Sequence, residues 1–175
     1  QFYADQNYYD SPAIKVYGTL NLKGTAENMI TINPSERYSN FACIMELSVI
    51  ISTYNNAVSL ERTLRSLAQQ DADKAQWECI VVNNASTDNT QSVVESLIAE
   101  LDINIRLVEE PQQGLSYARN RGIAESKGEF LVFIDDDETV NKEFVSAYID
   151  LYRNDGAFAA GGKVVACYDG GRPKW

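Results

Sequence analysis

Short apolar runs alternate with amphipathic stretches along the chain from residue 47 onward. Four runs rich in β-branched and aromatic residues predict buried strands. These runs span Leu47–Ser52, Glu78–Val82, Ile103–Glu109 and Phe130–Ile134. The stretches between them, residues 58–69, 88–101 and 115–126, place apolar side chains at helical spacing. This alternation of strands and helices predicts βαβ units, and therefore an α/β fold with a mostly parallel sheet flanked by helices.

The pattern of strands and helices continues for a short distance after residue 140 and is missing before residue 47. A further helix is predicted over residues 142–153, followed by a strand with a glycine kink over residues 158–165. Residues 1–46 do not share the strand–helix pattern, so we treat them as an N-terminal extension of unknown role. A small subdomain, an arm that packs on a neighbouring molecule and expression-derived residues are the three alternatives for this extension.

Four consecutive acidic residues, Asp135 to Glu138, end the fourth apolar run. Neighbouring carboxylates repel one another, so they require water, positive charge or a metal ion. In open α/β sheets ligands bind beyond the carboxyl ends of the strands, which is where these acids are predicted to lie. We therefore predict that Asp135 and Asp137 bind a divalent cation that in turn binds a phosphate. A solvated acidic turn is the alternative for this stretch alone.

Composition narrows the choice of ligands and partners. A net charge of -10 over 175 residues argues against nucleic acid, because the phosphate backbone would be repelled. The absence of histidine removes Ser-His and Cys-His catalysis and every histidine-containing metal site. The three cysteines, Cys43, Cys79 and Cys167, are widely spaced and are predicted to be small buried hydrophobes. Oxygen ligands remain, and these suit Mg²⁺ or Mn²⁺.

The location of the chain is predicted from two absences in the sequence. No apolar run approaches the ~20 residues that span a bilayer, and no pattern of a secretory signal is present. We therefore predict a cytoplasmic protein, and leave open peripheral association with the inner face of the membrane.

Polar residues also follow the first two strands. Ser52, Thr53 and Tyr54 end the first strand, and Asn83 and Asn84 end the second. Each alone is typical of an ordinary turn. Because the carboxyl ends of parallel strands meet at one edge, an aromatic ring, two amides and an acidic cluster are predicted to come together there, as a nucleotide would require. No GxGxxG or GxxxxGK[ST] motif is present to support a dinucleotide-binding or P-loop protein.

Four segments of the sequence together resemble the successive motifs of family 2 glycosyltransferases. They are LSVIISTYN (47–55), IVVNNASTDNT (80–90), GLSYARNRG (114–122) and GEFLVFIDDDE (128–138). The resemblance runs from residue 47 to about 165 and implies a GT-A, Rossmann-like fold for residues 47–175. It covers the donor-binding half of the family's domain. We therefore expect this domain to be incomplete at its C-terminus, with the general base of the reaction beyond Trp175.

The resemblance also implies roles for individual residues. Asn84 falls where the family often has an aspartate that reads the base edge, and Asp88 falls in the family's STD element, where it could cap a helix with Gln91. Binding of the nucleotide sugar is implied for Ser52, Thr53, Tyr54, Asn83, Asn84, Arg119 and Asp136, with Asn120 nearby. The DXD motif, Asp135 and Asp137, is implied to bind Mg²⁺ or Mn²⁺ together with the diphosphate, supported by Glu138.

The activity implied by the resemblance is transfer of a sugar from a nucleotide-diphospho-sugar, with a UDP-sugar favoured, to a hydroxyl of a glycan or lipid-linked acceptor. Family members of this kind invert the anomeric centre and serve bacterial surface polysaccharide synthesis. Because the acceptor half is expected to be missing, we expect this chain to bind nucleotide and to transfer sugar poorly. A homodimer remains open.

Two alternatives stand beside the glycosyltransferase. A nucleotidyltransferase-like enzyme would use the acids for phosphoryl chemistry, but it would normally carry a basic, glycine-rich loop after the first strand, and residues 54–57 are not one. A non-catalytic interaction module would use residues 1–46 as a docking arm and leave the acids merely solvated.

Overall fold

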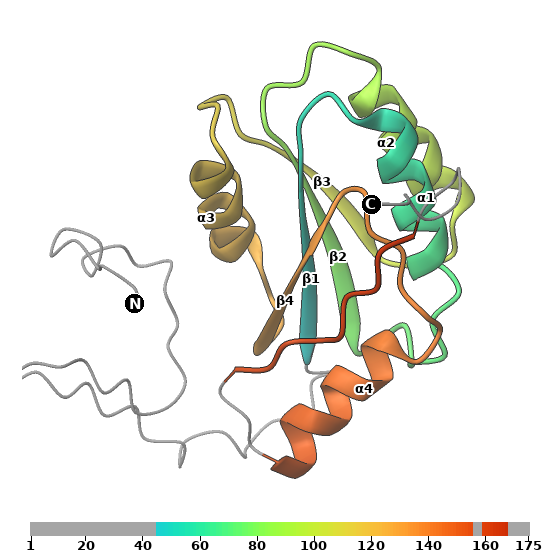
Figure 1. Ribbon diagram of the computed structural model, residues 1–175. Coiled ribbons are helices and arrows are strands. Elements are labelled where there is room, and N and C mark those ends of the chain that lie inside the picture. The colour runs from blue at the N-terminus through green and yellow to red at the C-terminus, as the bar shows by residue number, and fades with distance from the viewer. Residues whose placement is uncertain (1–44, 156–158, 168–175) are drawn as a thin grey trace, which may run out of the picture.

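A four-stranded parallel sheet forms the centre of the domain (Figure 1). The computed structural model describes residues 45–155 and 159–167. The strand order is β3-β2-β1-β4, so the first strand lies inside the sheet and the chain reverses its direction of travel after β3. The elements are β1 (Leu47–Thr53), α1 (Ala57–Leu67), β2 (Trp77–Asn83), α2 (Thr90–Glu100), β3 (Ile105–Glu109), α3 (Leu115–Glu125), β4 (Phe130–Asp135), α4 (Phe144–Asp150) and a π-helical turn, η4 (Leu151–Asp155).

The two faces of the sheet are covered by different helices, as the strand pattern requires. Successive side chains of β1 point to opposite faces, so Val49 and Ile51 pack with α1, α2 and α4. Ile50 instead packs with Ala118 of α3 on the other face. Figure 1 shows α3 alone on its side of the sheet and α1 and α2 on the opposite side. The predicted α/β fold with a parallel sheet is confirmed.

Most of the predicted elements occur within one or two residues of their predicted ends, and two predictions of local structure are wrong. The capping box of Asp88 and Gln91 does not form, because the Gln91 side chain donates to Glu95 instead (2.9 Å). The strand predicted over residues 158–165 is also absent in the described segment 159–167, which is irregular and exposed. Among the described residues β4 pairs only with β1, so this segment adds no fifth strand to the sheet.

One of the two described cysteines is buried and the other is exposed. Cys79 is buried in β2 as predicted, whereas Cys167 is exposed, contrary to the prediction. Cys43 and the expectations for residues 1–44 lie outside the described residues.

A buried carboxylate joins the strands near their amino-terminal ends. Glu78 of β2 is fully buried, and its Oε1 accepts hydrogen bonds from the Ser48 hydroxyl (2.9 Å) and from the Lys127 backbone N–H (2.8 Å). Its Oε2 accepts from Nε of Arg106 on β3 (3.0 Å). The Ser48 hydroxyl accepts in turn from the Gly128 backbone N–H (2.8 Å). Glu78 therefore links β1, β2, β3 and the connection that leads from α3 into β4.

The register of the strands determines which residues lie side by side at the carboxyl edge of the sheet. Thr53 lies beside Asn83, Asn83 beside Glu109, and Ser52 beside Asp135. The carboxyl ends of all four strands therefore reach one line across the sheet. The polar residues that follow the strands are brought to this edge together, as predicted.

We predict that Glu78→Ala lowers the free energy of unfolding by about 3–5 kcal/mol, because it leaves the Arg106 guanidinium and two other donors without their buried acceptor. Urea denaturation of wild type and variant at neutral pH measures this. Glu95→Ala is the matched control, because Glu95 is exposed on α2, and it should change stability by less than about 0.5 kcal/mol. Equal stabilities of the Glu78 and Glu95 variants would contradict the role of Glu78.

Candidate functional site

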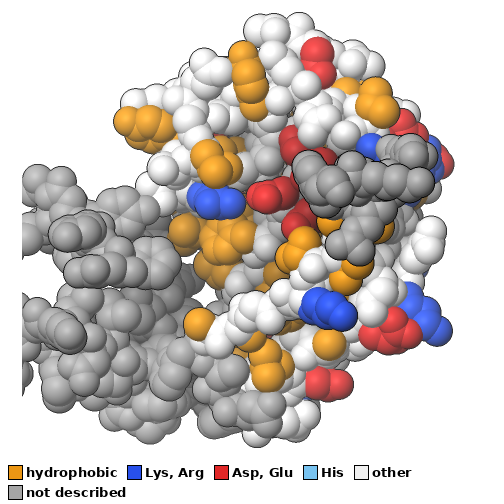
Figure 2. All heavy atoms as spheres, in the orientation of Figure 1, with side chains coloured by type: hydrophobic (Ala, Val, Ile, Leu, Met, Phe, Trp, Pro, Cys, Tyr) orange, Lys and Arg blue, Asp and Glu red, His pale blue; other side chains and the backbone are white. Residues whose placement is uncertain are grey.

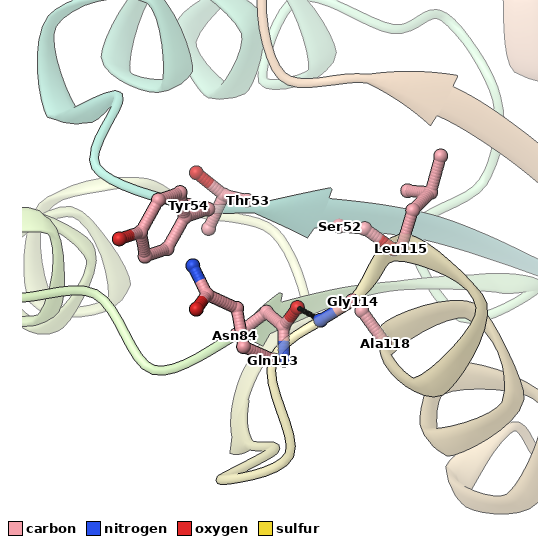
Figure 3. A pocket seen from close by; sticks show the side chains of 8 residues that line it. All are labelled: Ser52, Thr53, Tyr54, Asn84, Gln113, Gly114, Leu115 and Ala118. Atoms are coloured by element: carbon pink, nitrogen blue, oxygen red, sulfur yellow. Dashed lines mark hydrogen bonds between the residues drawn. The ribbon is translucent and has the colours of Figure 1, made fainter.

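A cavity of about 220 Å³ lies at the carboxyl edge of the sheet, between β1 and the start of α3 (Figure 3). Part of it was predicted: Ser52, Thr53, Tyr54 and Asn84 border the cavity, whereas Asn83 does not. Its complete lining is Ser52, Thr53, Tyr54, Asn84, Gln113, Gly114, Leu115 and Ala118. A volume of this size accommodates one ring system rather than a whole nucleotide sugar.

Ser52 lines this cavity and carries a hydroxyl group that makes no hydrogen bond within the described residues. Its Oγ atom is buried and has no hydrogen-bond partner within the described part of the chain. A buried polar atom without a partner is costly, so such an atom is commonly satisfied by water or a ligand. The Ser52 hydroxyl therefore keeps its hydrogen-bonding capacity unused by the described part of the chain.

The two ends of the cavity carry partly exposed apolar side chains. Tyr54 is 47% exposed and Leu115 is 52% exposed, and Figure 3 shows them at opposite ends of the cavity. An aromatic side chain at the rim offers a flat face for stacking. The cavity thus combines a stacking surface with polar groups, which suits a nucleobase or another flat polar ring.

The two amides predicted to contact a base are both engaged with the protein. Asn84 is 4% exposed; its amide nitrogen donates to the carbonyls of Glu110 (3.0 Å) and Gln112 (2.7 Å), and its oxygen accepts from the Gly114 N–H (2.7 Å). Figure 3 shows the last of these bonds. Asn83 donates to the carboxylate of Glu109 (3.0 and 3.1 Å). Both side chains hold the loops around the cavity in place.

The carboxylates of the acidic cluster after β4 differ in how many protein groups they contact. Asp136 accepts from the Thr53 hydroxyl (2.7 Å) and from the Asn56 amide (2.8 Å), so it ties the end of β4 to the loop after β1. Glu138 accepts from the Asp135 backbone N–H (3.2 Å). The Asp135 side chain is 65% exposed and lies 3.5 Å from the Arg119 guanidinium. Asp137 is exposed.

These acids and Arg119 lie on the same side of the molecule as the cavity. Figure 2 shows acidic side chains gathered near the carboxyl end of β4, with a basic side chain and a hydrophobic patch beside them. Asp135 belongs to β4, which pairs with β1, and its register partner is Ser52 of the cavity wall. Asp135, with Arg119 3.5 Å from its carboxylate, is therefore the neighbour across the sheet of a residue that lines the cavity.

The acidic residues after β4 fit Mg²⁺ or Mn²⁺ only as part of a coordination shell that a ligand completes. Among the described residues, no group of three or more acidic, histidine or cysteine side chains is arranged to hold a metal by itself. Mg²⁺ is commonly bound by one or two carboxylates, with substrate phosphates and water completing its coordination. Asp135 and Asp137 are exposed carboxylates of that number, so the residues fit an ion that binds together with a phosphorylated ligand.

Asp88 has a structural role in this region. Its Oδ1 accepts from the Thr90 hydroxyl (2.5 Å) and the Thr90 N–H (3.0 Å), which lowers the pKa of Asp88. Beside it, the Asn55 side-chain oxygen accepts from the Thr87 N–H (2.7 Å) and the Asp88 N–H (3.2 Å). Asn55 itself has a left-handed backbone (φ 50°). These contacts join the loop after β1 to the loop after β2.

Four of the residues that line the cavity were not predicted. Gln113, Gly114, Leu115 and Ala118 come from the loop after β3 and the first turn of α3. The sequence shows only that residues 111–114 break a strand, and a strand break does not reveal which loop side chains face a cavity. The signal that pointed to this region was the GLSYARNRG segment, which begins at Gly114.

The structure is an α/β domain with a cavity at the carboxyl edge of the sheet, near the point where the strand order reverses, which is where open α/β sheets bind ligands. A sequence profile described as glycosyl transferase family 2 matches residues 48–175. The chain therefore belongs to glycosyl transferase family 2, and its fold is of the GT-A type.

Several characterised proteins are similar to parts of this chain. The poly(ribitol-phosphate) β-N-acetylglucosaminyltransferase TarS of Staphylococcus aureus is 36% identical over 115 residues, which cover 64% of this chain and 20% of TarS. The succinoglycan biosynthesis protein ExoM of Rhizobium meliloti is 34% identical over 132 residues, covering 75% of this chain and 42% of ExoM. The chain thus spans a fifth to two fifths of the length of these curated relatives.

Solved structures are similar over the same region. Residues 1–349 of S. aureus TarS in complex with UDP-GlcNAc match with a TM-score of 0.57 and 33% identity, covering 62% of this chain and 31% of that one. The mannosyltransferase PcManGT of Pyrobaculum calidifontis in complex with GDP-Man and Mn²⁺ matches with a TM-score of 0.59 and 29% identity, covering 62% and 32%. In the part of this chain that the structure describes, no helix is long and apolar enough to cross a bilayer.

The low pKa of Asp88 gives a prediction about pH. Ionised Asp88 stabilises the fold above its ordinary pKa of 3.8, and this contribution is lost as the pH falls through the lowered folded-state pKa. Asp88→Ala should therefore lower the melting temperature at pH 7, and the difference from wild type should shrink as the pH falls below 3.8. Thermal melts across this range measure it. A difference that stays constant down to the lowest pH at which the chain remains folded would contradict the prediction.

Proposed function

We propose that this chain is the donor-binding part of a glycosyltransferase that takes a sugar from a nucleotide-diphospho-sugar to an acceptor hydroxyl. The observation that carries the proposal is the placement of two features on one edge of the sheet. A cavity at strand β1 is lined by the exposed Tyr54 ring and by Ser52, whose hydroxyl has no hydrogen-bond partner among the described residues. Ser52 is the register partner of Asp135, an exposed acid two residues before exposed Asp137. The cavity would receive the base and ribose of such a donor, and the acids would lie near its diphosphate.

Each part of the donor has a proposed contact. The base stacks on Tyr54, and Ser52 and the cavity wall at Thr53 meet the base and ribose. Asn83 and Asn84 keep the surrounding loops in position through their amide hydrogen bonds. Asp136 contributes by fixing Thr53 and Asn56 rather than by touching the donor.

The diphosphate is proposed to lie over Asp135, Asp137 and Arg119. Asp135 and Asp137 would hold Mg²⁺ or Mn²⁺, with Glu138 supporting Asp135 through its backbone N–H. When bound, such an ion offsets the negative charge that grows on a departing nucleoside diphosphate. Arg119 adds a positive charge 3.5 Å from Asp135, close enough to turn from this carboxylate to a phosphate.

The remaining features of the activity are proposals that rest on the family. A UDP-sugar is the favoured donor, because the TarS structure matched at 33% identity holds UDP-GlcNAc. A GDP-sugar remains the main competitor, because PcManGT holds GDP-Man. We further propose an inverting reaction on a glycan or lipid-linked acceptor in surface polysaccharide synthesis, in the cytoplasm or at the inner face of the membrane.

The domain organisation is likewise proposed. Residues 47–175 form the donor-binding domain, and residues 1–46 precede it as an extension. Membership of family 2 favours the glycosyltransferase over a nucleotidyltransferase-like enzyme or a non-catalytic module.

Nucleotide titration tests the metal part of this proposal. We predict that the chain binds UDP in the presence of Mn²⁺ and that Asp135→Asn/Asp137→Asn weakens this binding by about tenfold or more, which corresponds to about 1.4 kcal/mol. Isothermal titration calorimetry with and without Mn²⁺ measures both effects. GDP and dTDP, titrated in the same way, compare the bases.

Asp71→Asn is the matched control, because Asp71 is an exposed aspartate in the loop after α1, away from the sheet edge that carries the site. It should bind UDP like wild type. Metal-dependent binding that survives in the double variant would show that these two acids do not hold the ion, and failure of all three nucleotides to bind would overturn the proposed donor site.

A further inference from the structure

We propose that Gln113 reads the hydrogen-bonding edge of the donor base and that Asn84 only positions it. The inference rests on the proposed nucleotide site and adds a specificity-determining residue to it. The family resemblance implies that residue 84 contacts the base edge. The proposal gives that contact to Gln113 instead.

Asn84 has no spare donor with which to read a base. An amide nitrogen carries two hydrogens, and both are used in bonds to the carbonyls of Glu110 and Gln112. The amide oxygen accepts from the Gly114 N–H at 2.7 Å, and the residue is 4% exposed. Contact with a base would require Asn84 to give up bonds that hold the loop, and a buried group left unpaired is costly.

The same bonds place Gln113. Asn84 forms hydrogen bonds with the backbone of Gln112 and Gly114, the two neighbours of Gln113 in the chain. These bonds fix the loop on both sides of Gln113. Gly114 has φ 144°, a conformation that favours glycine, and a Cβ there would lie 3.1 Å from the Tyr117 ring. The backbone that carries Gln113 is therefore fixed at both ends of the residue.

Gln113 has the free chemistry that Asn84 lacks. It lines the cavity together with Tyr54 and Ser52, and within the described residues no protein group forms a hydrogen bond with its side-chain amide. Gln112, the adjacent residue of the same type, does not line the cavity. Of the two glutamines in this loop, the structure therefore presents one to the cavity and directs the other elsewhere.

A glutamine amide complements the edge of a pyrimidine base. Its oxygen can accept from the N3–H of uracil while its nitrogen donates to the neighbouring carbonyl oxygen. With the base stacked on Tyr54, these bonds would fix the rotation of the ring in the cavity. Blocking N3 should therefore remove much of the contribution of Gln113.

The test compares UDP with its N3-methylated analogue, 3-methyl-UDP, in the presence of Mn²⁺. Wild type should bind 3-methyl-UDP about tenfold or more weakly than UDP, the scale of a lost hydrogen bond plus a misplaced methyl group. Gln113→Ala should bind UDP about tenfold more weakly, and its penalty for the methyl group should fall below about threefold. Gln112→Ala is the matched control and should keep both the affinity and the full methyl penalty.

Three results would count against the inference. A full methyl penalty in Gln113→Ala, with UDP still bound, would mean that another group reads the edge and would leave the donor site standing. Equal effects of Gln112→Ala and Gln113→Ala would indicate a loss of loop structure rather than of base reading. Failure of wild type to bind UDP or any other nucleotide would overturn the proposed function, and this inference with it.

Discussion

The buried carboxylate of Glu78 is the interaction on which the arrangement of this domain depends. It accepts from β1, from β3 and from the backbone just before β4, so it fixes the strands relative to one another near the edge opposite the site. A buried charge is tolerated only when it is paired and fully hydrogen-bonded, and Arg106 and two further donors meet that condition. With this edge held together, the carboxyl edge can carry loops whose polar side chains serve a ligand.

Polar residues at the carboxyl edge divide into those that hold loops and those that are left for a ligand. Asn84 holds the loop that contains Gln113, and Asp136 joins the end of β4 to the loop after β1. The Ser52 hydroxyl has no hydrogen-bond partner among the described residues, and within the same residues the Asp135 carboxylate has only an exposed ion pair with Arg119. Because exposed pairs of this kind contribute little to stability, Asp135 can exchange this partner for an ion or a phosphate at low cost.

The sequence predicted the fold well because the fold depends on periodicity. Alternation along β1 sends Val49 and Ile50 to opposite faces, and the apolar stripe of α1 covers one of them. The prediction failed for residues 159–165, which form no strand although the described part of β4 leaves one edge unpaired. Strand propensity describes a surface that packs against partners, so composition alone could not decide this segment.

The sequence predicted several of the residues that meet at the site, but not which of their side chains are hydrogen-bonded to the protein. That Thr53, Asn84 and Asp135 meet at one edge follows from parallel strands alone. Which of them is engaged could not be predicted, because the partners lie far apart in the chain: the Thr53–Asp136 bond spans 83 residues and the Asn84–Gln112 bond spans 28. Gln113 was missed for the same reason, since only the folded loop distinguishes it from Gln112.

The central claim, a nucleotide site at the carboxyl edge beside α3, is tested most directly by mapping bound UDP on the folded chain. A titration of the ¹⁵N-labelled protein with UDP and Mg²⁺, which is diamagnetic, followed by amide NMR, would locate the ligand without relying on any substitution. The account predicts shifts concentrated at Ser52 to Tyr54, Gln113 to Ala118 and Asp135 to Asp137. Shifts confined to the groove along the edge strand β3, between Gln91 and Arg121, or no shifts at all, would contradict it.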